Sequence, residues 1–150
     1  MRAVIQRVSE ASVIIENEII SRIEIGLVIL LGIEIDDNTE DVKWLANKTS
    51  QLRIFSDIEG KMNNSITDVN GAVIVVSQFT LHAKTKKGNR PSYIKASRPE
   101  QAIPLYELFK EELSQLIGKK VQSGVFGANM QVSLINDGPV TIIIDTKNKD

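Results

Sequence analysis

The sequence predicts a single α/β domain of the α+β type: strand-rich, with mostly antiparallel or mixed sheets and two main helices packed outside them. Three observations support this fold class. Runs of Ile and Val recur along the chain and favour strands. Apolar residues follow helical spacing in two segments. Polar turn residues separate many of the apolar runs, as in hairpins.

The first half of the chain is predicted to contain four strands and one helix. The polar residues 16–18 separate two β-branched runs and indicate a hairpin. Gly26 ends this pattern, and the continuous apolar run after it is typical of a strand buried on both faces. Helix N-cap formers at 36–39 then precede a helical stripe. The expected strands are 2–8, 12–15, 19–25 and 27–33, and the stripe comprises Val42, Leu45, Ala46, Thr49 and Leu52.

The second half is predicted to contain short strands, loops and one long helix. Ser97 and Glu100 have the spacing of a capping box. Pro104 either begins or kinks the helix that follows, and Gly118 is placed to end it. The apolar stripe of this helix comprises Leu105, Tyr106, Phe109, Leu113, Leu116 and Ile117. Strands are expected at 53–55, 72–79, 121–125, 130–135 and 140–144, with a loop at 56–69 and an exposed loop at 82–93.

Composition limits the class of protein. The 150 residues suit one domain over 1–150, with a frayed tail at 146–150. A net charge of −1 provides no global basic field, so any RNA contact must be local. The chain has no cysteine, and its acidic pairs lack metal-ligand spacing, so no metal or other cofactor is expected. No signal-peptide pattern or membrane-length apolar run is present, which favours a soluble cytoplasmic protein without membrane contact.

The segment Ser77-Gln78-Phe79-Thr80-Leu81 follows an apolar run and supplies donors and acceptors where a buried strand ends. As a purely structural feature, Ser77 and Gln78 would satisfy backbone groups while Phe79 and Leu81 fill the core. That interpretation explains Gln78 poorly, because a large amide beside a buried run needs several hydrogen-bond partners. As a functional feature, the backbone N–H groups of Phe79 and Thr80 would face an ester carbonyl and stabilise its developing oxyanion.

The segment Asn136-Asp137-Gly138-Pro139-Val140-Thr141 lies between two other apolar runs. On residue types alone, Asp137-Gly138 is a common hairpin turn and Pro139 opens the next strand. The alternative is a functional Gly-Pro pair, because this bond readily adopts the cis form and glycine tolerates φ angles that other residues avoid.

The two segments together resemble the signature motifs of the D-aminoacyl-tRNA deacylases, editing enzymes that free tRNA from D-amino acids. The resemblance runs from Met1–Val8 through Gly124–Ala128 to the strand after Pro139, in the family's order and spacing. It implies a compact β-rich homodimer that binds the 3′ end of aminoacyl-tRNA. The implied reaction is hydrolysis of the ester of D-aminoacyl-tRNA, and of Gly-tRNA mischarged on a non-cognate tRNA, releasing tRNA and the amino acid.

The resemblance also implies which residues surround the substrate. Ser77 and Gln78 would bind the terminal adenosine and its aminoacyl group, beside the backbone amides of Phe79 and Thr80. Phe126 and Met130 would help to enclose that adenosine, the first as a stacking surface and the second as an adaptable apolar wall.

Chiral selection is implied for the second motif. In the family, the corresponding Gly-Pro pair has a cis bond and reaches into the pocket of the partner subunit, where its carbonyls exclude L-side chains. The resemblance implies the same role for Gly138-Pro139. Arg7 fits the family's Gln-Arg-Val element, and its five donors would clamp carbonyls near this turn. As a purely structural residue, Arg7 would be a surface arginine on a strand.

Thr80 is a candidate nucleophile, and the only histidine, His82, lies two positions away, which places both side chains on one face of a strand. A triad would also need an orienting carboxylate, and none is suggested nearby. We interpret His82 as a loop residue. The free hydroxyl next to the ester on the substrate's ribose offers another route, because it can position or activate water. We therefore assign 77–80 to binding and oxyanion stabilisation, with direct action of the Thr80 hydroxyl left open.

Two other functions remain open. A non-catalytic, translation-associated RNA-binding module would leave the ester intact, and the low net charge and few aromatic residues count against it. A generic Thr/His esterase would also cleave esters that lack RNA. The basic loop after the first motif is either solvated or contacts phosphates of the tRNA acceptor end; it carries Lys84, Lys86, Lys87, Arg90 and Lys95.

Overall fold

The computed structural model describes residues 1–150 and contains eight strands, two α-helices and one short 3₁₀ helix. The strands are β1 (Arg2–Ile15), β2 (Glu18–Ile23), β3 (Gly26–Gly32), β4 (Phe55–Ser56), β5 (Met62–Asn64), β6 (Ala72–Ser77), β7 (Gln122–Ser123) and β8 (Gln131–Asp145). The helices are α1 (Thr39–Gln51), the 3₁₀ helix η1 (Phe79–His82) and α2 (Pro99–Ile117). No helix is long and apolar enough to cross a membrane.

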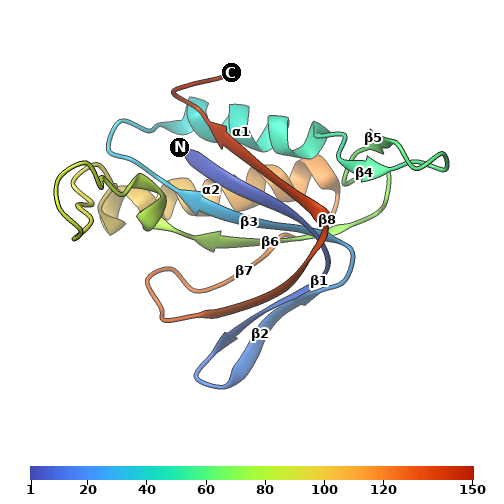
Figure 1. Ribbon diagram of the computed structural model, residues 1–150, viewed down its shortest axis with the longest axis horizontal. Coiled ribbons are helices and arrows are strands. Elements are labelled where there is room, and N and C mark those ends of the chain that lie inside the picture. Colours follow the sequence, from blue (N-terminus) through green and yellow to red (C-terminus); the bar gives the residue numbers. More distant parts are fainter.

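Six strands form one mixed sheet in the order β2-β1-β3-β6-β7, and β8 pairs with β1 along its other side. The pairs β3/β6 and β6/β7 are parallel, whereas β1 is antiparallel to β2, β3 and β8. In Figure 1 both helices cover one face of β3 and β6, while β2, β7 and parts of β1 and β8 curl beneath the other face. This strand-rich mixed architecture with two helices confirms the predicted fold class.

Two hydrophobic clusters fill the two sides of β3 and β6. The larger cluster lies under the helices and includes Leu45, Ile29 and Phe109, all fully buried. The smaller cluster lies on the other face and includes Val13, Val28, Ile23 and Ile74. Adjacent residues of β3 therefore belong to opposite clusters, which confirms that 27–33 holds a strand buried on both faces.

The helix ends test the predicted capping residues. Asn38 caps α1 in a capping box with Asp41, as the N-cap formers at 36–39 indicate. The predicted Ser97–Glu100 box is wrong, because the N-cap of α2 is Arg98 and makes no side-chain cap. Pro99 occupies the first helical turn, where its fixed φ suits the helix, so the start shifts by one residue. Ser97 Oγ instead donates to Gln101 Oε1 at 3.0 Å.

Several strand boundaries differ from those predicted. The strands expected at 2–8 and 12–15 form one strand, and those at 130–135 and 140–144 also form one. The loop expected at 56–69 contains the short β4–β5 hairpin. The expected frayed tail makes specific contacts at its start: Thr146 is buried, and Lys147 Nζ lies 2.9 Å from Asp41 Oδ2. β1 and β8 are continuous because they pair with each other along most of their length, and a local sequence pattern does not report this pairing.

Candidate functional site

A pocket of about 260 Å³ opens where β6 ends. One side is formed by the end of β6 and the start of η1, and the other by the segment that joins β7 to β8. The joining segment is held close because Gly124 N donates to Val75 O of β6 at 3.3 Å. The lining residues are Val76, Ser77, Gln78, Phe79, Phe126, Gly127, Ala128, Asn129, Met130 and Val132.

The structure thus brings together five residues expected to bind substrate, from two segments about 50 positions apart. They are Ser77, Gln78, Phe79, Phe126 and Met130. Phe79 is 52% exposed, so it does not fill the core as the purely structural interpretation requires. An aromatic ring left half in water at a pocket mouth is available to a ligand.

Phe126 packs against Tyr106, a residue that sequence analysis assigns only to the apolar stripe of α2. The two rings meet edge to face with centroids 5.8 Å apart. Tyr106 Oη donates to Val75 O at 2.9 Å, and Lys110 Nζ lies 5.0 Å from the centre of its ring. Burial raises the pKa of Tyr106 to about 12, so its hydroxyl remains a donor at neutral pH. Tyr106 therefore links β6 to a ring that lines the pocket.

Thr80 and His82 do not form a nucleophile–base pair. Residues 79–82 form a 3₁₀ helix, so two-residue spacing does not place both side chains on one face. The Thr80 hydroxyl instead accepts from Gln78 Nε2 at 2.5 Å. This bond also gives the Gln78 amide a partner at the pocket mouth.

His82 is buried, at 4% exposure, and not part of an exposed loop as predicted. Its Nδ1 lies 4.0 Å from Glu34 Oε2, a carboxylate that sequence analysis did not place near it, and its Nε2 has no hydrogen-bond partner. Glu34 follows β3, and the pairing of β3 with β6 brings it to the end of β6 where η1 begins. A contact of this kind depends on sheet register and has no local sequence signal.

Gly138 and Pro139 lie within β8 and not in a hairpin turn, so the hairpin alternative is wrong. The strand β8 stays paired with β1 on both sides of them, from Gln6↔Thr141 to Val8↔Asn136. The extra residues of β8 between these pairs bulge out of the ladder. The Gly138–Pro139 peptide bond is cis.

Arg7 holds this bulge from the neighbouring strand. Its Nε donates to Asp137 O at 3.2 Å, and its Nη1 donates to Ile54 O at 2.7 Å. The side chain is only 11% exposed, so Arg7 is not a surface arginine. A Cβ added at Gly138, where φ is +118°, would lie 2.7 Å from Arg7 Nη2. The guanidinium therefore packs against the glycine and leaves no space for a side chain.

The bulge and the pocket lie at opposite ends of the sheet. Asn136 pairs with Val8, which pairs with Gly26, which pairs with Ala72 at the start of β6. The pocket begins near Ser77 at the other end of β6. Five residues of strand separate these ends by roughly 17 Å. Within one chain, the Gly138–Pro139 bulge does not line the pocket.

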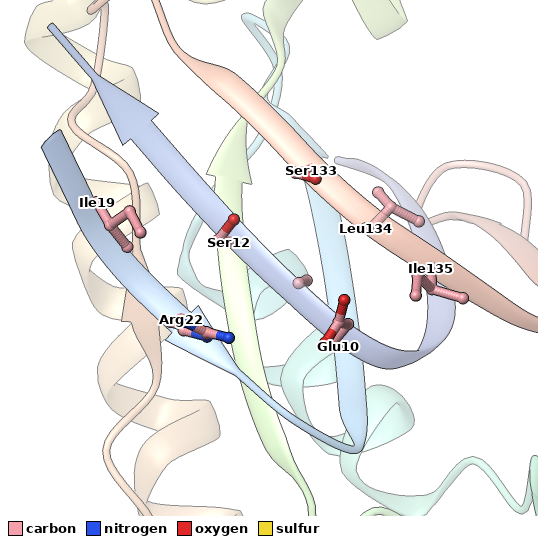
Figure 2. A pocket seen from close by; sticks show the side chains of 8 residues that line it. Glu10, Ser12, Ile19, Arg22, Ser133, Leu134 and Ile135 are labelled. Carbon is pink, nitrogen blue, oxygen red and sulfur yellow. The ribbon is translucent and has the colours of Figure 1, made fainter. Parts of the chain in front are cut away.

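A second hollow, of about 210 Å³, lies on the outer face of β1, β2 and β8 (Figure 2). Figure 2 shows Glu10 and Ser12 from β1, Ile19 and Arg22 from β2, and residues 133–135 from β8 around it. None of the residues expected to bind substrate lines this hollow. No group of three His, Cys, Asp or Glu side chains in the chain could hold a metal ion.

Comparison with known proteins identifies the family of the chain. The family model described as D-Tyr-tRNA(Tyr) deacylase matches residues 4–145. The D-aminoacyl-tRNA deacylases of Flavobacterium psychrophilum and Akkermansia muciniphila are 64% and 62% identical over 150 residues, covering all of both chains. A solved c-Myc DNA unwinding element binding protein is 41% identical with a TM-score of 0.92, over 97% of this chain and 98% of that chain.

A second solved structure extends the similarity of fold. A probable eukaryotic D-amino acid tRNA deacylase superposes with a TM-score of 0.82 at 16% identity, over 95% of this chain and 97% of that chain. At this identity the likeness concerns the fold alone. The family model and the relatives above 50% identity cover nearly the whole chain, including both motifs. The chain therefore belongs to the D-Tyr-tRNA(Tyr) deacylase family.

Proposed function

We propose that this protein hydrolyses the ester of D-aminoacyl-tRNA, releasing free tRNA and the D-amino acid. The observation that carries the proposal is the pocket at the end of β6, where Gln78 and Phe79 face Phe126 and Met130. A half-exposed ring and apolar walls suit a terminal adenosine, and polar groups at one edge suit its ester. Membership of the family supports the same substrate.

The backbone at the start of η1 supplies the oxyanion site. Phe79 and Thr80 are its first two residues, and the first N–H groups of a helix have no carbonyl partner within it. Amides free to point at a carbonyl stabilise the negative charge that develops on its oxygen as water adds. The bond from the carbonyl carbon to the ribose 3′ oxygen then breaks, and that oxygen takes a proton.

The ribose 2′ hydroxyl of the terminal adenosine orients or activates the attacking water. The geometry of Thr80 and His82 supports this assignment, because the Thr80 hydroxyl bonds to Gln78 and His82 is buried beside Glu34. A vicinal hydroxyl lies beside the ester in every 3′-aminoacyl-tRNA and is absent from DNA. The mechanism therefore requires binding and orientation from the protein, and no covalent intermediate.

The Thr80 side chain is expected to be dispensable for chemistry. Thr80→Val keeps the shape of the side chain and the backbone N–H but removes the hydroxyl. Single-turnover deacylation of D-Tyr-tRNA should fall by no more than about 10-fold, the loss of one hydrogen bond that orients Gln78. A loss of about 10³-fold with substrate binding intact would show that the hydroxyl acts directly.

The Gly138–Pro139 bulge acts in the pocket of a second copy of the chain. Its distance from its own pocket supports this assignment. β8 is a 15-residue edge strand without a single buried residue, and Ile135 and Ile143 are 53% and 69% exposed on it. A long, partly apolar edge of this kind offers unpaired backbone groups to a strand of another chain. In the partner's pocket, the bulge forms a wall that excludes L-side chains by clash.

Light scattering at assay concentration is expected to give about twice the 16.6 kDa chain mass. A charged residue in the apolar edge, Ile143→Lys, should shift the protein towards monomer and reduce hydrolysis in parallel, since the wall would be lost. Lys43→Glu, at an exposed position of α1 outside this edge, is the control for a change of surface charge. An active and selective monomer would exclude a wall supplied by the partner.

Deacylation of three matched substrates tests the function. D-Tyr-tRNA should be cleaved fast and L-Tyr-tRNA slowly. Gly-tRNA should also be cleaved, because glycine has no side chain for the wall to reject. A purely RNA-binding protein would leave all three esters intact, and a generic esterase would cleave a simple D-tyrosine ester equally well.

A further inference from the structure

The basic loop after η1 forms a defined arm, which we take as residues 84–98. Lys84 and Ser92 pair through two backbone hydrogen bonds of 2.8 and 3.0 Å, closing the tip of the arm. Its other end is fixed to the segment after β3, because Ile35 N donates to Lys95 O and Ser97 N donates to Ile33 O. The arm is therefore closed near its tip and attached at its C-terminal end to the segment after β3.

The arm carries one sign of charge. Six of the chain's 18 Lys and Arg side chains lie on it, and none of the 19 acidic residues does. All six are exposed, and none forms an ion pair or a side-chain hydrogen bond within the chain; they are Lys84, Lys86, Lys87, Arg90, Lys95 and Arg98. The protein as a whole has a net charge of −1, so this positive patch is local. Clustered, unpaired cations of this kind attract phosphate groups.

An aromatic pair connects the arm to the pocket. Tyr93 packs edge to face on Phe79, with ring centroids 5.0 Å apart. Phe79 lines the pocket at the end of β6, whereas Tyr93 lines a separate hollow of about 480 Å³ on the arm side. Ile35, Ile94 and Arg98 also line this second hollow, and Ile94 is 70% exposed. Two hollows thus lie on either side of one pair of aromatic rings.

We propose that the arm and the hollow beside Tyr93 bind the unpaired nucleotides that precede the terminal adenosine of the tRNA substrate. The proposal rests on the proposed function and specifies how the same site holds the rest of the acceptor end. The base before the terminal adenosine lies in the hollow against Tyr93 and Ile94. The phosphates on its 5′ side lie along the cations of the arm.

A single RNA strand fits this surface better than other partners. Every base has a flat face that stacks on an aromatic ring, so the hollow accepts the invariant end of any tRNA. Binding to cations without base-specific contacts suits an enzyme that must act on tRNAs of different sequence. The surface is local, which agrees with a chain that lacks a global basic field.

The test compares two esters that differ only in the upstream nucleotides: D-Tyr-tRNA and D-tyrosyl-adenosine. The readout is the ratio of their kcat/KM values. Tyr93→Ala should lower this ratio by about 10-fold through the loss of base stacking, and Tyr93→Phe should restore it. Because both esters use the same pocket, damage to the pocket itself would lower both values and leave the ratio unchanged.

The charge of the arm is tested by the salt dependence of binding to uncharged tRNA. In Lys87→Ala/Arg90→Ala, the slope of log K against log salt should become shallower by roughly 1.4, since each phosphate contact on a single strand contributes about 0.7. The control, Lys61→Ala/Lys120→Ala, also removes two exposed charges: Lys61 lies in the β4–β5 turn, where it pairs with Glu59, and Lys120 follows the C-terminal end of α2. Figure 1 shows the β4–β5 hairpin at the opposite end of the molecule from the loop after η1.

An unchanged ratio in Tyr93→Ala, or an equal change of slope in the arm and control variants, would overturn the proposal. If the arm binds an acidic peptide more strongly than uncharged tRNA, the RNA proposal is also overturned, and a protein partner is indicated. If the wild type cleaves neither ester, the proposed function fails. The arm is then judged by the tRNA-binding slopes alone, which need no catalysis.

Discussion

Gly138→Ala is expected to lower hydrolysis of D-Tyr-tRNA by roughly 10²-fold while the protein remains folded. The new Cβ would lie 2.7 Å from Arg7 Nη2 and 3.0 Å from Val140 Cγ2, at a φ of +118° that L-residues rarely adopt. Relief of this clash moves the bulge or displaces Arg7 from its bonds to Asp137 O and Ile54 O. A displacement of about 1 Å of a wall that positions the substrate costs on the order of 10² in rate.

The matched control for Gly138→Ala is Gly60→Ala, in the turn of the β4–β5 hairpin. Gly60 also has a positive φ, +79°, but a Cβ there meets nothing within 4 Å. Gly60→Ala therefore places an L-residue at a similarly disfavoured positive φ, but it causes no steric clash and lies far from the bulge. Both variants are assayed on D-Tyr-tRNA and L-Tyr-tRNA, with a urea titration to monitor folding. Equal D-to-L ratios in wild type and Gly138→Ala would mean that the bulge does not select chirality.

Local sequence patterns predicted the elements whose determinants lie close together in the chain. Runs of Ile and Val predicted the strands, and the continuous apolar run at 27–33 predicted that β3 is buried on both faces. The N-cap formers at 36–39 indicated the start of α1, because a cap acts within its own helical turn; the structure places the cap at Asn38. The second box failed because Pro99 sets its own φ and competes with Ser97 for the start of α2.

The parts of the site that were not predicted depend on contacts between distant residues. Asp137-Gly138 has the composition of a hairpin turn, and only pairing with β1 on both sides turns it into a bulge. Glu34 lies near His82 because of the register between β3 and β6. Tyr106 has the spacing of a core residue, and its support of Phe126 is visible only in three dimensions. Sequence analysis named five residues that the structure brings into one pocket, and it missed the contacts of Tyr106 and Glu34 beside them.

A D-Tyr-tRNA that ends in 2′-deoxyadenosine and is charged on its 3′ oxygen is expected to be cleaved about 10³-fold more slowly than the ribose form. The reason lies in the protein's own groups. The Thr80 hydroxyl bonds to Gln78, His82 is buried beside Glu34, and neither contacts the other, so no side chain at the pocket mouth is arranged to activate water.

If the ribose supplies that hydroxyl, its removal leaves the oxyanion site at Phe79 and Thr80 intact, and the substrate should still bind. The deoxy substrate should therefore inhibit cleavage of the ribose form with an inhibition constant close to the KM of the latter, while its own single-turnover rate falls. A matched tRNA with a 2′-deoxy sugar at the preceding nucleotide controls for altered stacking of the 3′ end, and it should be cleaved at close to the normal rate. Rapid cleavage of the terminal deoxy substrate would instead require a protein group to act on the water. The Thr80 hydroxyl, which lies next to the oxyanion amides, would then be the first candidate.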